Sequence, residues 1–252
     1  MKIAVCIKQV VTREWQLRVN EGATWIRDSD ASFELNEPDA YALEEALRLK
    51  EKHGGEVVVC SAGPARASQV IREALARGAD RAIHVEADAL ASADAFAVAD
   101  ALAAAVRDEK FDLVLTGLQS DDQGFGQVGV VLAEKLSMPH ATIIMEVQAS
   151  ESGLRVKREL EGGWFQWVTL PLPAVLTIQS GINQLRYATL KGIMAAKKKE
   201  IRKVAPAAAQ ANQRILRVYF PEKGKKTHMI TGSAGDAAKE LVMRLRDDAR
   251  VL

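Results

Sequence analysis

Residues 2–10 read KIAVCIKQV, an apolar run in which hydrophobic and polar residues do not strictly alternate. Runs of this kind are typical of strands that are covered on both faces, as in a parallel sheet. Similar runs return at residues 56–60, 81–85 and 111–116. The segments between them change to the i, i+3, i+4 spacing of helices. The sequence therefore predicts an α/β fold, with a mostly parallel sheet and helices on both faces.

The first of these helices carries its own start signal. Asn36 is a preferred capping residue, Pro38 suits the first turn, and Asp39 stands where the acid of a capping box would reach back. Gly78 predicts the end of the second helix. The remaining predicted helices, each placed after a predicted strand, span residues 65–77, 92–107 and 126–136.

Two segments interrupt this alternation. Residues 15–34 surround the turn signal Asn20-Glu21-Gly22 and predict a short hairpin that could cover a ligand. Residues 141–178 contain three or four strand candidates, with turn signals at 152–153 and 162–163. We therefore expect antiparallel additions at one edge of the sheet.

The C-terminal part of the chain reads as an appended arm. Residues 204–213 are rich in alanine and carry no charge, as is typical of a linker. A strand candidate at 215–220 and an amphipathic helix near 235–246 follow. The sequence thus predicts a domain of residues 1–203, then a linker and C-terminal arm of residues 204–252.

The composition limits the classes of function. The 34 Lys and Arg residues nearly balance the 33 Asp and Glu residues, for a net charge of +1, which excludes a polyelectrolyte. There is no apolar run of about 18 residues that could span a membrane, and no signal-peptide pattern, so we expect a cytoplasmic protein. Cys6 and Cys60 lie in strand-like runs without CxxC spacing, which argues against a metal site or a redox pair.

A glycine-rich segment spans residues 117–129. Within it, residues 124–129 read GFGQVG and match the pattern G-x-G-x-x-G. A dinucleotide fingerprint follows the first strand directly, whereas this segment follows the fourth predicted strand after an intervening stretch. Three interpretations stay open: a nicotinamide site, a helix entry that only turns a corner, and a nucleotide-phosphate cradle of another α/β fold. We favour the last, because bare amides at a helix start attract phosphate.

Small and polar residues gather at the carboxyl ends of the predicted strands, where open α/β sheets bind ligands. They include Lys8, the segment 61–63 and Thr116, and together they could surround one adenosine; alternatively, Gly63 and Pro64 form only a tight turn. The chain lacks the S-G-G-x-D-S loop expected of an ATP-cleaving relative, a G-x-S-x-G nucleophile elbow and an H-E-x-x-H pair. No reaction centre of its own is therefore predicted.

Residues 186–203 form the most basic stretch of the chain. A basic run is often only a solvated helix face. Nucleic-acid binding would require interleaved aromatic residues and a basic balance overall, so we expect no nucleic-acid partner. The run better suits docking to an acidic partner, with Leu190 or Ile193 as an apolar anchor.

Three stretches carry a family resemblance. They read RELEGG at residues 158–163, LPAVLT at 172–177 and RYATLKGIMAAKKK at 186–199. In their order and spacing, the chain closely resembles the beta subunit of electron transfer flavoproteins, over nearly all of its length to about Val204. Residues 36–52 and 76–85 match as well.

The resemblance implies an adenine-nucleotide-binding, HUP-like fold and an obligate heterodimer with an alpha subunit, on which the C-terminal arm would pack. It implies an FAD at the junction of the subunits. Electrons would come from dehydrogenases, commonly acyl-CoA dehydrogenases of fatty acid oxidation, and pass to a membrane quinone oxidoreductase. Such a protein is an electron carrier rather than a stand-alone enzyme, and its beta subunit holds AMP.

The resemblance also places the site residues. It implies that AMP is contacted by Cys6, Asn36, Glu37, Pro38, Asp39, Ala62, Asp122, Gln123, Gly124, Phe125, Gly126, Gln127, Val128, Gly129, Val130, Val131, Leu132 and Ala133. Within a partner-recognition loop at 187–196, it implies partner contacts by Tyr187, Leu190, Ile193 and Met194, with Leu190 as the anchor.

Two departures from the family pattern bear on the ligand. Relatives commonly read Gln-Ala-Ile-Asp-Asp or Asn in the glycine loop, whereas residues 119–125 read QSDDQGF here. The slot could therefore hold something larger, such as the second FAD of flavin-bifurcating members. Arg13 stands where some relatives carry an aromatic residue near the flavin, so no flavin contact is assigned to it. A stand-alone nucleotide-binding protein is the remaining alternative.

Overall fold

The computed structural model describes residues 1–150, 153–206, 211–221, 224 and 227–252. These residues form two compact units, Met1–Val218 and Tyr219–Leu252. The first unit contains the sheet and five of the α-helices, and the second contains one helix, α6 (Ala234–Asp247). The predicted helix near 235–246 is therefore confirmed to within one residue at each end.

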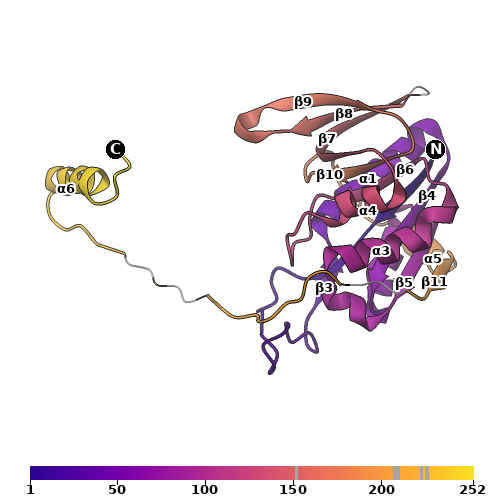
Figure 1. Cartoon of the computed structure of the whole chain (residues 1–252), viewed down its shortest axis with the longest axis horizontal. Helices are drawn as coiled ribbons and strands as arrows, with labels where there is room; N and C mark the ends of the chain where they lie inside the picture. The colour runs from indigo at the N-terminus through magenta and orange to yellow at the C-terminus, as the bar shows by residue number, and fades with distance from the viewer. Residues whose placement is uncertain (151–152, 207–210, 222–223, 225–226) are drawn as a thin grey trace. The chain divides into compact units, whose positions relative to one another are not determined.

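One large sheet organises the first unit, with the strand order β11-β5-β4-β1-β6-β10-β7-β8-β9 (Figure 1). Neighbours from β11 to β7 pair in parallel, whereas β7, β8 and β9 pair antiparallel. The strands are β1 (Lys2–Cys6), β4 (Glu56–Gly63), β5 (Arg81–Glu86), β6 (Leu113–Gly117), β7 (His140–Ser150), β8 (Gly153–Glu159), β9 (Phe165–Leu170), β10 (Ala174–Ile178) and β11 (Ile201–Val204). The predicted parallel sheet with antiparallel additions is confirmed.

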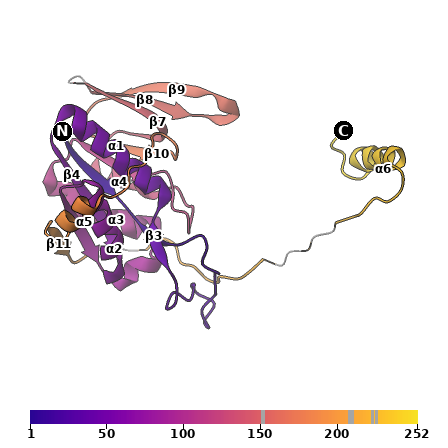
Figure 2. The same cartoon turned by 180° about the vertical axis from the view of Figure 1, so that it is seen from behind.

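Helices cover both faces of this sheet, because successive strand residues point to opposite sides. Ile3 and Val5 belong to one core cluster, and Ala4 to the other. Figure 1 shows α3 and α4 on one face, and Figure 2 shows α1, α2 and α5 on the other. The helices are α1 (Glu37–His53), α2 (Ser68–Arg77), α3 (Ala95–Val106), α4 (Val128–Leu136) and α5 (Leu190–Ala196), with the 3-10 turns η1 (Ala65–Ala67), η2 (Asp88–Ser92), η3 (Arg107–Glu109) and η4 (Glu161–Gly163).

The first predicted strand, residues 2–10, is two strands. β1 ends at Cys6, and β2 (Gln9–Val11) leaves the sheet to pair antiparallel with β3 (Phe33–Leu35). The break occurs where the main-chain N–H of Lys8 donates to the carboxylate of Asp39 at 2.8 Å. In place of the hairpin predicted within 15–34, the structure has a single bridge between Val19 and Ile26. The paired strands of this region are β2 and β3, at the two ends of the segment.

The antiparallel strands have one buried and one exposed face. Leu154 and Val156 of β8 are buried in the core. On the opposite face, Arg155 lies 4.4 Å from the ring of Trp167, and Lys157 lies 4.1 Å from the ring of Phe165. The predicted turn at 162–163 is observed with both glycines at positive φ, and the turn at 152–153 lies partly outside the described residues.

The C-terminal part of the chain differs from the prediction in two ways. The strand predicted at 215–220 is absent from the described structure, because the bond from Val218 N to Ala23 O (2.7 Å) does not extend into a ladder. Conversely, β11 was not predicted, and it pairs in parallel with β5. The predicted linker at 204–213 overlaps residues outside the described set.

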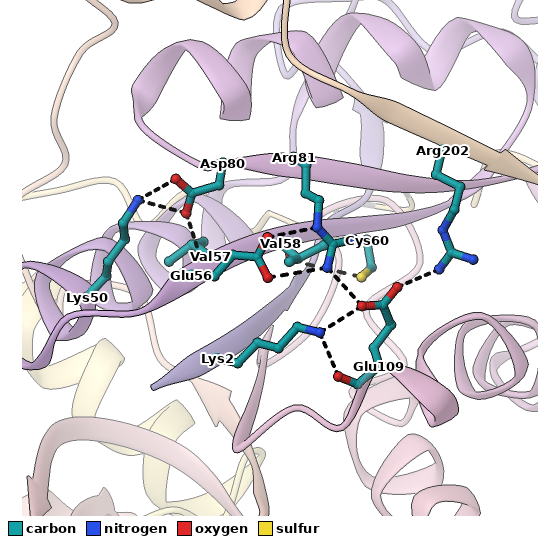
Figure 3. A network of polar contacts seen from close by, with 10 residues as sticks. All are labelled: Lys2, Lys50, Glu56, Val57, Val58, Cys60, Asp80, Arg81, Glu109 and Arg202. Atoms are coloured by element: carbon teal, nitrogen blue, oxygen red, sulfur yellow. Dashed lines mark hydrogen bonds and ion pairs between the residues drawn. The ribbon is translucent and has the colours of Figure 1, made fainter.

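A charged network holds the amino-terminal edge of the sheet (Figure 3). Glu109 accepts hydrogen bonds from Lys2 (2.8 Å), Arg81 (2.8 Å) and Arg202 (2.9 Å), and Arg81 also pairs with Glu56. The hydrogen bonds from Arg81 and Lys2 lower the pKa of Glu109 to about 2. The network thus connects β1, β5 and β11 at one edge, leaving the carboxyl ends of the strands for a binding site.

Candidate functional site

A cleft lies at the carboxyl ends of β1, β4 and β6. Its empty volume is about 770 Å³, which includes the open solvent at its mouth. The cleft is lined by Cys6, Ile7, Lys8, Asn36, Asp39, Ala62, Leu90, Ala93, Ala95, Val98, Leu102, Thr116, Gly117, Leu118, Gln119, Ser120, Gln123, Phe125, Gly126, Gln127, Val128 and Gly129.

Asn36 and Asp39 do not cap α1 as predicted, although Asn36 occupies the N-cap position. Asn36 donates from Nδ2 to Gln119 O (3.0 Å) and accepts at Oδ1 from Asp121 N (2.9 Å). Asp39 accepts from Lys8 N (2.8 Å) and from Gly117 N (2.9 Å). Both side chains therefore join the helix start to the strand ends and the glycine loop, which gives the cleft its shape.

Asp39 contributes a carboxyl group to the cleft wall. Burial raises its pKa to about 7, against the opposing effect of its hydrogen bonds from Lys8 N and Gly117 N. A buried carboxylate is tolerated where donors surround it. Asp39 is thus poised to change charge near neutral pH.

Two glycines are required by close approach rather than by conformation. A Cβ on Gly117 would come within 3.0 Å of Asp39 and Pro38. A Cβ on Gly129 would come within 3.0 Å of Thr116 and Thr177. The backbone of the cleft floor therefore lies against its neighbours with no room for a side chain.

Lys8 holds the glycine loop over the cleft. Its ammonium group donates to Asp122 Oδ1 (2.7 Å), Gln123 Oε1 (2.9 Å) and Ser120 Oγ (3.3 Å). Farther along the loop, Gly124 and Gly126 adopt φ values of 64° and 63°, which favour glycine. Lys8 thus places a cation, and the loop places main-chain groups, at the wall of the cleft.

The loop leads into α4, which begins at Val128 rather than at residue 126 as predicted. Gln127 makes no side-chain cap. By helix geometry, the amides of the first turn have no acceptor within the helix, and the positive end of the helix dipole lies there. This end of α4 is therefore suited to an anion.

Apolar side chains line the cleft together with these polar groups. They include Val98 and Leu102 of α3, together with Leu90 of η2. Phe125 of the glycine loop is half exposed beside them. A ligand with one charged end and one flat apolar end matches this distribution of surface.

The predicted contact residues divide into two groups. Those that line the cleft are Cys6, Asn36, Asp39, Ala62, Gln123, Phe125, Gly126, Gln127, Val128 and Gly129. Those that do not line it are Glu37, Pro38, Asp122, Gly124, Val130, Val131, Leu132 and Ala133. Leu132 and Ala133 lie on the buried face of α4, and Asp122 is linked to the cleft by its bond to Lys8.

Sequence reasoning missed the apolar side chains of the cleft. Ala95, Val98 and Leu102 lie at helical spacing on one face of α3, so the pattern could have been read. The same spacing is typical of a helix face that packs into the core, and only the fold distinguishes a cleft wall from such a face.

The two cysteines are unsuited to nucleophilic chemistry. Cys6 and Cys60 are free and buried. Burial raises both thiol pKa values, that of Cys60 to about 12, so both thiols stay protonated. Within the described residues, no cluster of three or more His, Cys, Asp or Glu side chains could hold a metal ion. Among the described helices, none is long and apolar enough to cross a membrane.

The four predicted partner contacts lie together on and before α5. Tyr187 is 90% exposed and Leu190 is 77% exposed, far more than apolar residues of a core. Ile193 and Met194 are exposed beside them. We refer to Tyr187, Leu190, Ile193 and Met194 as the docking face. Exposed apolar clusters of this kind mark interaction surfaces.

Comparison with known proteins relates this architecture to one family. The family described as "Electron transfer flavoprotein domain" matches residues 24–209. A protein named "Electron transfer flavoprotein subunit beta" from Methylophilus methylotrophus is 38% identical over 98% of each chain. Relatives of the same name are 35% identical in Homo sapiens, over 100% of this chain and 99% of theirs, and 33% identical in Bacillus subtilis, over 100% of both.

Proposed function

Because this chain belongs to the electron transfer flavoprotein family and is one of its beta subunits, we propose that it pairs with an alpha subunit to carry electrons on FAD. The FAD lies at the junction of the subunits. Electrons arrive from dehydrogenases, commonly acyl-CoA dehydrogenases, and pass to a membrane quinone oxidoreductase. The heterodimer is an electron carrier of the cytoplasm rather than a stand-alone enzyme. Full-length similarity to beta subunits supports this proposal.

The cleft is the proposed site of AMP, and its lining by both polar groups and apolar side chains is the observation that carries this assignment. The amides at the start of α4 offer donors to a phosphate. Lys8 also lines the cleft, where its ammonium group is paired with Asp122. Val98 and Leu102 offer an apolar surface to the adenine ring. AMP has one charged end and one flat end, as the cleft requires.

The chain's own residues contribute placement and electrostatics. The flavin, when bound, supplies the redox chemistry. Asn36 and Asp39 fix the strand ends and the loop around the adenylate, while the protonated thiols of Cys6 and Cys60 take no part in electron transfer. The proposed role of AMP is therefore structural.

A second FAD in place of AMP is the alternative that one observation favours. A smaller hollow beside the cleft shares Lys8, Ala62 and Leu90 with it. That hollow is lined by Trp25 and Phe33, among other residues. A ligand longer than AMP could extend across the shared residues onto this aromatic surface, as in a flavin-bifurcating member.

The docking face is the proposed contact with the electron-donating dehydrogenase. Its large apolar side chains resemble the anchors that dominate transient interfaces. Lys191 of α5 and Lys197 and Lys198 just after it are exposed, and their charge would speed encounter with an acidic partner. The docking face and the cleft therefore serve different partners.

Co-expression with the alpha subunit of the same source tests the function. We expect a yellow heterodimer that an acyl-CoA dehydrogenase reduces in the presence of its substrate. A colourless chain that does not associate with the alpha subunit would contradict the proposal. Tight binding of ATP or NAD(P) by the isolated chain in equilibrium dialysis would instead support a stand-alone nucleotide-binding protein.

A further inference from the structure

Three consecutive lysines follow α5, and the structure separates them. Lys197 and Lys198 are exposed, and neither lies within ion-pair distance of a carboxylate among the described residues. Lys199 is only partly exposed, and its ammonium group turns inward. It donates to the main-chain oxygens of Leu75 (3.0 Å) and Ala79 at the end of α2. The third lysine is thus engaged within the protein.

Arg72 makes the reciprocal contact. From the middle of α2, its guanidinium group donates to the main-chain oxygens of Ala196 (2.6 Å) and Lys199 (2.8 Å), at the end of α5. The last carbonyl groups of a helix accept no hydrogen bond from within the helix, and the negative end of its dipole lies there. Arg72 of α2 therefore supplies a cation to the end of α5, and Lys199, just after α5, supplies one to the end of α2. We refer to this pair as the Arg72–Lys199 clamp.

Other contacts show that α5 depends on α2 for its position. A Cβ on Gly192 would come within 3.0 Å of Ala76 O, so the two backbones lie directly against each other. Ala196 is buried in the core beneath them. A helix of seven residues is not stable alone in water. The docking face is therefore only as ordered as its attachment to α2.

The segments on each side of α5 are fixed as well. Before the helix, Arg186 pairs with Glu44 (2.7 Å) and Glu51 (2.6 Å) of α1. After it, Arg202 of β11 pairs with Glu109 (Figure 3). Between these two points, the Arg72–Lys199 clamp joins the end of α5 to α2 through polar contacts.

We propose that Lys199 is a positioning residue for the docking face, acting with Arg72, and that Lys191, Lys197 and Lys198 alone supply its docking charge. This inference rests on the proposed docking function of α5. The clamp orders the exposed apolar side chains, whereas the other lysines steer the partner. Burial lowers the pKa of Lys199 from its ordinary value, as expected of an enclosed ammonium group.

The test compares Lys198→Gln with Lys199→Gln in the complete heterodimer. Two readouts are needed: hydrogen–deuterium exchange of the amides in 187–199, and the salt dependence of kcat/KM with acyl-CoA dehydrogenase. We expect Lys199→Gln to speed exchange about tenfold, by loss of hydrogen bonds to charge, and to leave the salt dependence unchanged. Lys198→Gln is expected to leave exchange unchanged and to weaken the salt dependence.

Unchanged exchange in Lys199→Gln, or a salt dependence weakened as much as in Lys198→Gln, would overturn the proposal. Lys199→Arg retains a donor and is expected to restore slow exchange. If Lys199→Gln does not fold, Arg72→Gln takes its place, with the same expected exchange and the same contrary result. Leu190→Ala serves as the control for docking itself: unchanged kinetics there would contradict the docking function, while the exchange readout still judges the clamp.

Discussion

The cleft and the docking face differ in the chemical groups that form them. Main-chain groups and small residues line much of the cleft, including Gly117 and Gly129, which lie against their neighbours without room for a Cβ. The docking face consists of large exposed side chains on a seven-residue helix and just before it. A concave site made from the core suits a ligand that is retained, and a convex surface of side chains suits a partner that is exchanged. Substitutions should therefore fail in different ways in the two regions.

Gly117→Ala should have the largest effect. Its Cβ would overlap Asp39 and Pro38, and overpacking of this kind costs about 3 kcal/mol. We expect a marked drop in thermal stability and loss of the bound nucleotide, measured by calorimetry and by chromatography of the released ligand. Gly63→Ala is the matched control, because its Cβ would meet only Ala67 at an ordinary 3.8 Å. Equal stability of the two variants would contradict the claim that the backbone at Gly117 has no room for a Cβ.

Asp39→Asn tests the cleft through the pH dependence of stability. The pKa of Asp39 is raised from 3.8 to about 7 by burial, so the folded state binds more protons than the unfolded state between these values. The stabilisation is complete below pH 3.8 and is lost as pH rises towards 7, at no more than about 1.4 kcal/mol per pH unit.

We therefore expect the unfolding free energy of the parent to fall with pH in this window relative to that of Asp39→Asn. Denaturant titrations at pH 5, 6 and 7 measure the difference. Parallel curves would show that Asp39 does not titrate in this range.

Leu190→Ala tests the exposed region. Leu190 is 77% exposed, so its loss should hardly change stability, but removal of an interface anchor lowers kcat/KM for the dehydrogenase about tenfold. The nucleotide and flavin content should stay the same. Leu160→Ala, at another exposed leucine, is the control. A similar kinetic loss in both variants would contradict the assignment of the anchor to Leu190 of α5.

Thr189→Ala should have the smallest effect. The Thr189 hydroxyl accepts from Gly192 N at 3.0 Å and caps α5, and loss of such a cap costs about 1 kcal/mol. We expect kcat/KM to fall about threefold, with recovery in Thr189→Ser. Stopped-flow reduction of the flavin by the dehydrogenase measures both. Failure of Thr189→Ser to recover would mean that the hydroxyl does not act as a cap.

The sequence was most informative about elements that local patterns determine. The βα units, the antiparallel edge and the helix α6 follow from periodicity and turn residues. The family followed from motifs, of which the basic stretch after Arg186 is the most distinctive. These features depend on neighbours in the chain, which a single sequence displays.

Contacts between distant residues were not predictable in this way. Asn36 and Asp39 have the residue types of a capped helix start, yet their side chains bond to Gln119, Asp121, Lys8 and Gly117 instead. The apolar residues of 215–220 predicted a strand, but a strand needs a neighbour and the described structure provides none there. Lys199 could not be separated from Lys197 and Lys198 by type or charge, because only the position of α2 distinguishes them.

Nucleotide analysis of the purified heterodimer tests the central assignment most directly. After denaturation, the released ligands are separated and counted against protein. We predict one AMP and one FAD per heterodimer, with AMP lost in Gly117→Ala. Two FAD and no AMP would instead identify the larger ligand in the cleft, and a heterodimer that releases neither adenylate nor flavin would contradict the account.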